Sequence, residues 1–154
     1  MKFTEPVNFS TVWPLLKNCK QFELNITNLV YDKNMATTMP LHRPMIASWV
    51  AFRNLPVSVY VVMPIINYFS TNPNFPQCVV LTFLPGTTFS DLQPLIKTAQ
   101  EKMHDSGVMF NKSGEHVSIN NGQQPPENDN AEIKDVVLRV TPEGWYQVDY
   151  YLPL

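Results

Sequence analysis

The chain has 154 residues, of which 44% are hydrophobic and 16% charged, and its formal net charge is −2. This length corresponds to a single domain with room for a sizeable core, and the hydrophobic content excludes a wholly disordered chain. Lysine and arginine form no run, so the sequence disfavours a nucleic-acid partner, whose phosphates need a clustered basic surface.

Cysteine content and hydropathy bear on the location of the protein. Cys19 and Cys78 are too few to form a disulfide framework. The N-terminus has no basic-then-apolar secretory leader, and no window approaches the ~20 apolar residues that cross a bilayer. We therefore expect a cytoplasmic protein with free thiols and without a transmembrane segment.

The first third of the chain predicts short elements. Residues 1–10 show no periodicity and are predicted to form a flexible arm, followed by a short helical turn around Trp13. In residues 21–31 apolar and polar side chains alternate, which predicts a half-buried strand. Residues 45–53 fit either a strand or a helix. We favour a strand, because prolines flank the segment closely and β-branched and aromatic residues are frequent.

Two further strands are predicted in the middle of the chain. Residues 57–69 are almost entirely apolar and predict a central strand, with Pro64 at a bulge or beyond the paired part. Residues 77–85 predict a returning strand, in which Val79, Leu81 and Phe83 share one face.

Residues 91–106 predict the one principal helix. Ser90 or Asp91 can cap its start, and Gly107 lies where a left-handed residue would end it. Pro94 falls in the predicted first turn, where its missing N–H costs little. The apolar residues recur at helical spacing and form one stripe: Leu92, Leu95, Ile96, Ala99 and Met103.

The C-terminal third predicts two hairpins. Residues 108–119 are predicted to turn around Asn111–Gly114, and residues 120–130 form a polar loop with two prolines and a glycine. Segments 132–140 and 145–152 flank a turn with Pro142 at its second position and Gly144 at its fourth. This is the clearest hairpin of the chain.

These elements predict an α+β fold in one domain, residues 1–154. About seven short strands follow one another as adjacent hairpins, without strand–helix–strand alternation. The sequence therefore favours an antiparallel sheet that is covered on one face by the helix at about 91–106.

One cluster of side chains has metal-binding chemistry. Glu101 and His104 are three residues apart on the predicted helix, and Glu115 and His116 begin the next strand. Carboxylates and imidazoles can bind a divalent metal, but the spacing matches no established ligand pattern, and a hydrated helix end explains the same residues. We therefore expect no cofactor, and Glu101, His104, Glu115 and His116 remain the metal site of an alternative, enzymatic interpretation.

The last strand is rich in aromatic side chains, which are enriched at protein interfaces. Familiar catalytic and nucleotide-binding motifs are missing from the sequence. We expect a non-enzymatic structural or interaction protein that binds a protein partner or itself, of a kind found among viral structural and accessory proteins. The alternatives are an enzyme of unrecognised family and a weak nucleic-acid-binding module. The predicted interaction residues are Trp145, Tyr146, Gln147, Asp149 and Tyr151.

Overall fold

The computed structural model describes residues 5–41, 48–70, 76–105, 118–119, 128–140 and 146–153. Its elements follow one another as β1 (Val7–Asn8), α1 (Phe9–Val12), a 3₁₀ turn η1 (Trp13–Leu16), β2 (Gln21–Leu24), β3 (Leu29–Val30), α2 (Met35–Leu41), β4 (Trp49–Leu55), α3 (Val59–Ser70), β5 (Cys78–Phe83), α4 (Phe89–Asp105), β6 (Ser118–Ile119), β7 (Asp135–Val140) and β8 (Tyr146–Tyr151).

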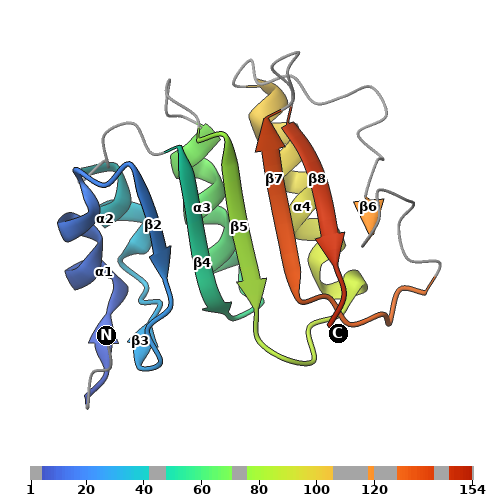
Figure 1. The fold of residues 1–154 in the computed structure, drawn as a ribbon, viewed down its shortest axis with the longest axis horizontal. Helices are drawn as coiled ribbons and strands as arrows, with labels where there is room; N and C mark the ends of the chain where they lie inside the picture. Colours follow the sequence, from blue (N-terminus) through green and yellow to red (C-terminus); the bar gives the residue numbers. More distant parts are fainter. Residues whose placement is uncertain are drawn as a thin grey trace.

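The main sheet has mixed strand directions. Its order in the described residues is β2-β4-β5-β7-β8-β6, visible from left to right in Figure 1. The pairs β2–β4 and β4–β5 are parallel, β5–β7 and β7–β8 are antiparallel, and the two-residue β6 pairs with β8 in parallel. The short strands β1 and β3 form a separate parallel pair. The fold is α+β as predicted, but the eight strands of the described residues form sheets of mixed direction, where an antiparallel sheet of about seven strands was predicted; the antiparallel part is confirmed for β5, β7 and β8.

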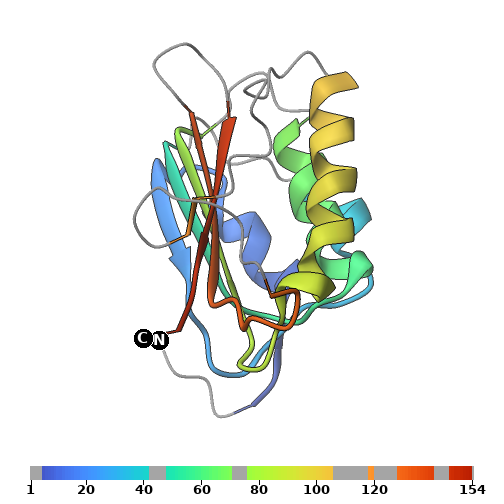
Figure 2. The ribbon, with the colours of Figure 1, turned by 90° about the vertical axis from the view of Figure 1, so that its right-hand side faces the viewer.

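The helices form one layer over one face of the sheet, as Figure 2 shows. Parallel strands need a crossover connection, and α3 supplies it between β4 and β5. In this layer α3 lies between α2 and α4 and packs against both. The described residues form four α-helices, whereas the sequence predicted one principal helix.

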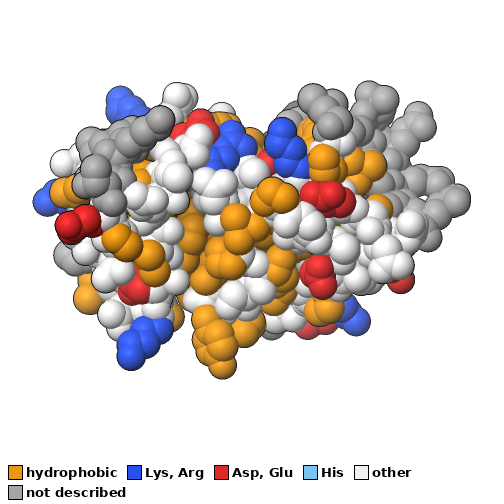
Figure 3. Space-filling model, turned by 90° about the horizontal axis from the view of Figure 1, so that it is seen from below, with side chains coloured by type: hydrophobic (Ala, Val, Ile, Leu, Met, Phe, Trp, Pro, Cys, Tyr) orange, Lys and Arg blue, Asp and Glu red, His pale blue; other side chains and the backbone are white. Residues whose placement is uncertain are grey.

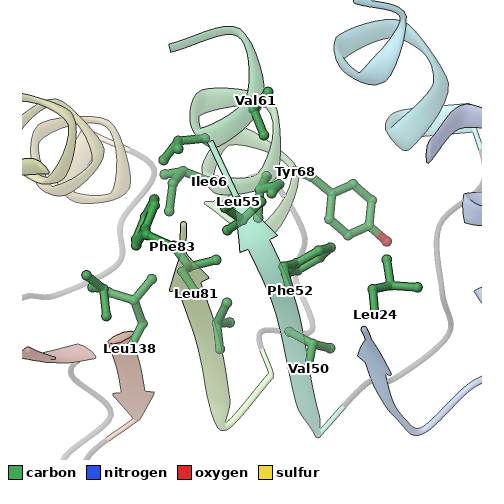
Figure 4. Packing of buried hydrophobic residues seen from close by; sticks show 14 of the residues in the cluster. Leu24, Val50, Phe52, Leu55, Val61, Ile66, Tyr68, Leu81, Phe83 and Leu138 are labelled. Atoms are coloured by element: carbon green, nitrogen blue, oxygen red, sulfur yellow. The ribbon is translucent and has the colours of Figure 1, made fainter. Parts of the chain in front are cut away.

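The core lies between the two layers. Along β2, β5 and β8 the described core residues are every second residue, because successive side chains of a strand point to opposite faces, whereas the irregularity after Phe52 breaks this alternation in β4. Figure 4 shows side chains from β2, β4, β5 and β7 reaching toward α3. The buried strand residues in this core are Phe22, Leu24, Val50, Phe52, Leu55, Val79, Leu81, Phe83, Val136, Leu138, Val148 and Tyr150.

The prediction of a central strand over residues 57–69 is wrong, because this segment forms α3. Its hydrogen bonds begin at Ser58, whose carbonyl oxygen accepts from the N–H of Val61 and of Val62 at 3.0 and 2.9 Å. An apolar run without polar interruptions cannot be assigned by periodicity. The run is apolar on nearly all sides because the sheet and two helices surround α3, which buries Val61, Val62, Met63, Ile65, Ile66 and Tyr68.

The helix predicted over residues 91–106 is confirmed as α4, although it begins at Phe89. Thr88 and Asp91 cap its start reciprocally. The Thr88 N–H donates to Oδ2 of Asp91 at 3.0 Å, and the Asp91 N–H donates to Oγ1 of Thr88 at 3.4 Å. Leu92 is fully buried, and Leu95 is partly buried against the same core.

The other sequence predictions have mixed outcomes. The C-terminal hairpin is confirmed, since β7 and β8 pair antiparallel from Asp135↔Tyr151 to Val140↔Tyr146. The predicted strand at 45–53 is β4, shifted toward the C-terminus, and the strand at 77–85 is β5. The predicted strand at 21–31 is divided into β2 and β3. The first hairpin, 108–119, lies outside the described residues except for β6.

The flexible arm predicted over residues 1–10 is wrong for its second half. Val7 and Asn8 pair with β3, and Phe9 is fully buried. The Phe9 ring stacks on Trp13 and on Tyr31, with centroid separations of 5.4 and 5.8 Å. This segment therefore contributes aromatic side chains to the core.

Asp32 connects α1 to the turn before α2 through hydrogen bonds. Its carboxylate accepts from the backbone N–H of Ser10 at 2.9 Å, from Oγ of Ser10 at 2.7 Å and from the N–H of Asn34 at 3.0 Å. Partial burial would raise the pKa of Asp32, but the hydrogen bonds from Ser10 and Asn34 outweigh it and lower the pKa below 3.8.

We expect Leu92→Ala to lower the free energy of unfolding by about 2–5 kcal/mol, because the truncation leaves a cavity under α4. Leu95→Ala should cost less, since Leu95 is only partly buried. Urea unfolding followed by circular dichroism measures both. If both variants lose only a small and equal amount of unfolding free energy, Leu92 and Leu95 do not hold α4 against the core.

We expect Asp32→Ala to lower the free energy of unfolding by about 1–2 kcal/mol at neutral pH, because three hydrogen bonds to a carboxylate are lost. The pKa of Asp32 is lower in the folded than in the unfolded chain, so the ionised carboxylate stabilises the fold above about pH 4. This contribution disappears as the pH falls through the folded pKa. The difference between wild type and variant in urea unfolding should therefore shrink at acid pH. A difference that does not depend on pH would contradict the proposed role of the charge.

Candidate functional site

A polar row crosses the sheet on the face away from the helices. Its centre is Arg53, near the carboxyl end of β4. Nε of Arg53 donates to Oε1 of Glu23 on β2 at 2.9 Å, and Nη1 donates to Oγ1 of Thr82 on β5 at 2.5 Å. The Thr82 hydroxyl donates in turn to Oδ1 of Asp135 on β7 at 2.5 Å. The row thus joins four neighbouring strands.

The backbone next to Arg53 is irregular. The pairing of β4 with β5 shifts register between Phe52 and Leu55, and Asn54 has a φ of +58°. Asparagine adopts this left-handed conformation more readily than most residues. The Tyr31 hydroxyl donates to the carbonyl oxygen of Arg53 at 2.6 Å, and burial raises the pKa of Tyr31, which keeps it a neutral donor. These contacts hold the carboxyl end of β4.

The charges of the polar row compensate one another. The Arg53 guanidinium lies 2.9 Å from the Glu23 carboxylate and 3.6 Å from the Asp135 carboxylate, with Arg53 side-chain exposure of 25%. One cation between two anions leaves little attraction for an anionic ligand. The arrangement is best explained as an ion-pair network that positions the strand ends.

An exposed apolar surface lies at the carboxyl ends of β4 and β5. It consists of Val57, Val59 and Tyr60 at the start of α3, and Leu84 after β5; we call these four residues the carboxyl-end patch. Their exposures are 38%, 49%, 79% and 44%. Figure 3 shows hydrophobic side chains gathered in the middle of this face and reaching its border, with charged side chains mostly around them.

Local hydrogen bonds bring the two parts of the carboxyl-end patch together. The N–H of Leu84 donates to the carbonyl oxygen of Leu55 at 3.0 Å, which holds the loop after β5 against the end of β4. Oγ of Ser58 accepts from the N–H of Tyr60 at 3.3 Å and caps the start of α3. The exposed side chains therefore stand on a hydrogen-bonded scaffold.

The sequence did not indicate the carboxyl-end patch, because residues 57–60 were assigned to a buried strand. Ser58 gives the signal that a helix begins there: it is a favoured N-cap residue directly before a long apolar run. A helix that begins after Ser58 has Val59 and Tyr60 in its first turn, at the end of the helix layer.

Only two of the four predicted metal ligands, Glu101 and His104, belong to the described residues, so the predicted metal site stays a prediction. Glu101 is exposed on α4, and His104 lies near the end of that helix. Glu115 and His116 lie outside the described residues. Within the part of the chain that is described, no group of three or more His, Cys, Asp or Glu residues could hold a metal ion.

The predicted interaction residues are only partly described. Tyr146, Gln147, Asp149 and Tyr151 belong to β8, where Val148 and Tyr150 are buried toward the helices. The Tyr150 ring meets Phe89 edge-on, with centroids 5.2 Å apart. Tyr151 is half-buried, and Trp145 lies outside the described residues. At Asp149 and Tyr150, β8 pairs with β6 on the side away from β7.

Neither cysteine forms a disulfide. Cys78 is in register with Trp49 on β4, which is in register with Gln21 on β2. Cys78 is therefore two strand spacings from β2, roughly 9–10 Å, and Cys19 precedes that strand. Disulfide formation requires Cα atoms within about 7 Å, so this fold keeps the two thiols apart.

Comparison of the chain with protein-family models, with curated proteins and with solved structures finds no match. In the described residues, no helix has both the length and the apolar character needed to cross a membrane.

We expect Arg53→Leu to lower the free energy of unfolding by about 1–3 kcal/mol, because the Thr82 hydroxyl loses a donor and the partly buried Asp135 carboxylate loses its nearby cation. Glu23→Gln is the matched control. The Glu23 side chain is 41% exposed, so the loss of its ion pair should cost at most about 0.5 kcal/mol. Urea unfolding of both variants measures the difference. Equal costs would argue against a structural network centred on Arg53.

Proposed function

We propose that this chain acts as a protein-interaction protein whose binding surface is the carboxyl-end patch. The observation that carries the proposal is the 79% exposure of Tyr60 at the start of α3, at the same end of the sheet as the exposed Val57, Val59 and Leu84. Single exposed apolar residues are ordinary on protein surfaces, but a group of them that includes an aromatic ring is typical of interaction sites.

The composition around the carboxyl-end patch supports the same function. Residues 54–70 and 83–90 contain no lysine, arginine, aspartate or glutamate. The centres of protein interfaces are poor in charged side chains and rich in aromatic ones, and a polar rim surrounds them. The paired Arg53, Glu23 and Asp135, together with the exposed Asp91 and Glu132, can form such a rim.

The scaffold under the patch also suits binding. Ordering flexible side chains and loops opposes association, so a surface that is held in place before binding loses less free energy. The loop after β5 is tied to β4 through Leu84 and Leu55, and its next part is tied to the segment before β7 by the Gly86 N–H, which donates to Oε1 of Glu132 at 2.8 Å.

The C-terminal hairpin remains a second proposed contact surface. Its residue Tyr151 pairs in register with Asp135, which belongs to the polar row described above. The hairpin and the carboxyl-end patch are therefore two candidate surfaces, and Tyr60 of the patch is more exposed than the half-buried Tyr151 of the hairpin.

The proposal is tested by selecting random peptides on the immobilised protein, coupled so sparsely that two copies cannot meet. We expect enriched peptides that lose binding to Tyr60→Ser and keep binding to Leu41→Ser. Leu41, 76% exposed at the end of α2, is a matched control because it is equally exposed but lies outside the patch. If no peptides are enriched, or if the enriched peptides bind Tyr60→Ser as well as wild type, the patch is rejected as a binding surface.

A further inference from the structure

We propose that the carboxyl-end patch binds a cationic amphipathic segment of another protein, whose apolar face covers Tyr60 and whose lysine or arginine side chains lie beside Asp91 and Glu132. This inference rests on the proposed function and specifies the chemistry of its partner. Acidic side chains border the patch on the side of α4 and β7, as Figure 3 shows to the right of the central hydrophobic side chains. An apolar surface with such a border complements a partner of opposite charge.

The loop after β5 fixes two carboxylates close to the patch. Two residues after Leu84, the N–H of Gly86 donates to Oε1 of Glu132 at 2.8 Å. The N–H of Thr88 donates to Oδ2 of Asp91 at 3.0 Å, and Thr88 also pairs with Glu132 in an isolated antiparallel bridge. Both carboxylates are therefore held against the loop that carries Leu84.

These two carboxylates have no cation beside them within the part of the chain that the structure describes. Asp91 and Glu132 are both exposed, and the ion pairs of the described residues are those of the polar row. Hydrogen bonds from the backbone and the side chain of Thr88 lower the pKa of Asp91 below its usual value of 3.8, so its carboxylate is charged at neutral pH. The border therefore offers negative charge that a partner can neutralise.

Acidic residues outnumber basic ones along this border. Asp129 adds a third exposed acidic side chain, and its carbonyl oxygen accepts from the N–H of Ser90, at the start of α4, at 2.8 Å. In residues 84–93 and 128–134 the sequence has one basic residue, Lys134. Lysine or arginine of a partner is attracted to this border, whereas an acidic partner is repelled.

The extent of the patch suits a short segment better than a broad protein surface. Stable interfaces between folded proteins bury about 800 Å² on each partner, whereas the patch consists of four exposed apolar side chains, among which Tyr60 is the most exposed. An amphipathic helix presents apolar side chains three and four residues apart on one face, and lysines can line the border of that face. The apolar face can then cover Tyr60 while the lysines reach the carboxylates.

Three synthetic amphipathic peptides of about four helical turns test the inference on the whole chain. They share one face of leucine and tryptophan, and their polar positions are all lysine, all glutamine or all glutamate. We expect the lysine peptide to bind roughly three- to tenfold more tightly than the glutamine peptide, and the glutamate peptide to bind most weakly. This difference should shrink as the salt concentration rises. Fluorescence anisotropy measures the three affinities.

A double variant, Asp91→Asn with Glu132→Gln, removes both charges and keeps an oxygen acceptor at each position. It should lose most of the preference for lysine and bind the glutamine peptide as the wild type does. Glu101→Gln is the matched control, because Glu101 is exposed on α4 about 15 Å along the helix from Asp91, beyond the screening length at physiological salt. Tyr60→Ser should weaken the binding of all three peptides.

Circular dichroism and urea unfolding show whether each variant is folded, and the comparison of the three peptides on the wild type needs no variant. If the wild type binds the lysine and glutamate peptides equally, or if the folded double variant keeps the full preference for lysine, the inference is overturned. If peptides selected from the random library bind through Tyr60 without enrichment of lysine or arginine, the inference is rejected and the proposed function stands. If no peptide binds through Tyr60, both are rejected.

Discussion

The burial of α3 between the sheet and the helices α2 and α4 is the constraint on which the rest of the structure depends. The parallel strands β4 and β5 can be neighbours only because α3 carries the chain back across the sheet. With apolar neighbours on most sides, α3 needs almost no polar residues along its length. Its ends are less enclosed, and the end that lies at the carboxyl edge of β4 presents Val59 and Tyr60 to solvent. The same burial thus accounts for the core and for the candidate interaction surface.

The two faces of the sheet carry different kinds of side chain. The helix-covered face supplies the core, whereas the other face carries the polar row of Arg53, Glu23, Thr82 and Asp135. That row lies close to the point where β4 shifts its register and ends. Its hydrogen bonds keep the ends of four strands in fixed relation, and the carboxyl-end patch is built on the loops that leave two of these strands. Electrostatic pairing on one face therefore supports an apolar surface at the neighbouring edge.

The sequence predicted those elements in which polar and apolar residues alternate with a clear period. Leu92 and Leu95 revealed α4, and the alternation around Val136 and Leu138 revealed β7, because each element has one face in the core and another outside it. Residues 57–69 lack such a period, since α3 is enclosed by protein. A strand over residues 57–69 leaves no strand–helix–strand connection in the pattern, and therefore predicts no parallel pairing of β4 with β5. It also gives no indication of the carboxyl-end patch, whose residues Val59 and Tyr60 lie at the start of α3.

Proline lies at the sixth residue of α2, α3 and α4, as Pro40, Pro64 and Pro94. Each ring lacks the N–H that would bond to the carbonyl four residues earlier, and each disfavours the helical geometry of the residue before it. Short helices are already marginal in water without tertiary contacts. These three segments therefore have little tendency to form helices on their own, and their helical structure comes from packing on the sheet. We therefore expect the secondary structure of these segments to be gained and lost together with their packing on the sheet, rather than to form first as separate helices.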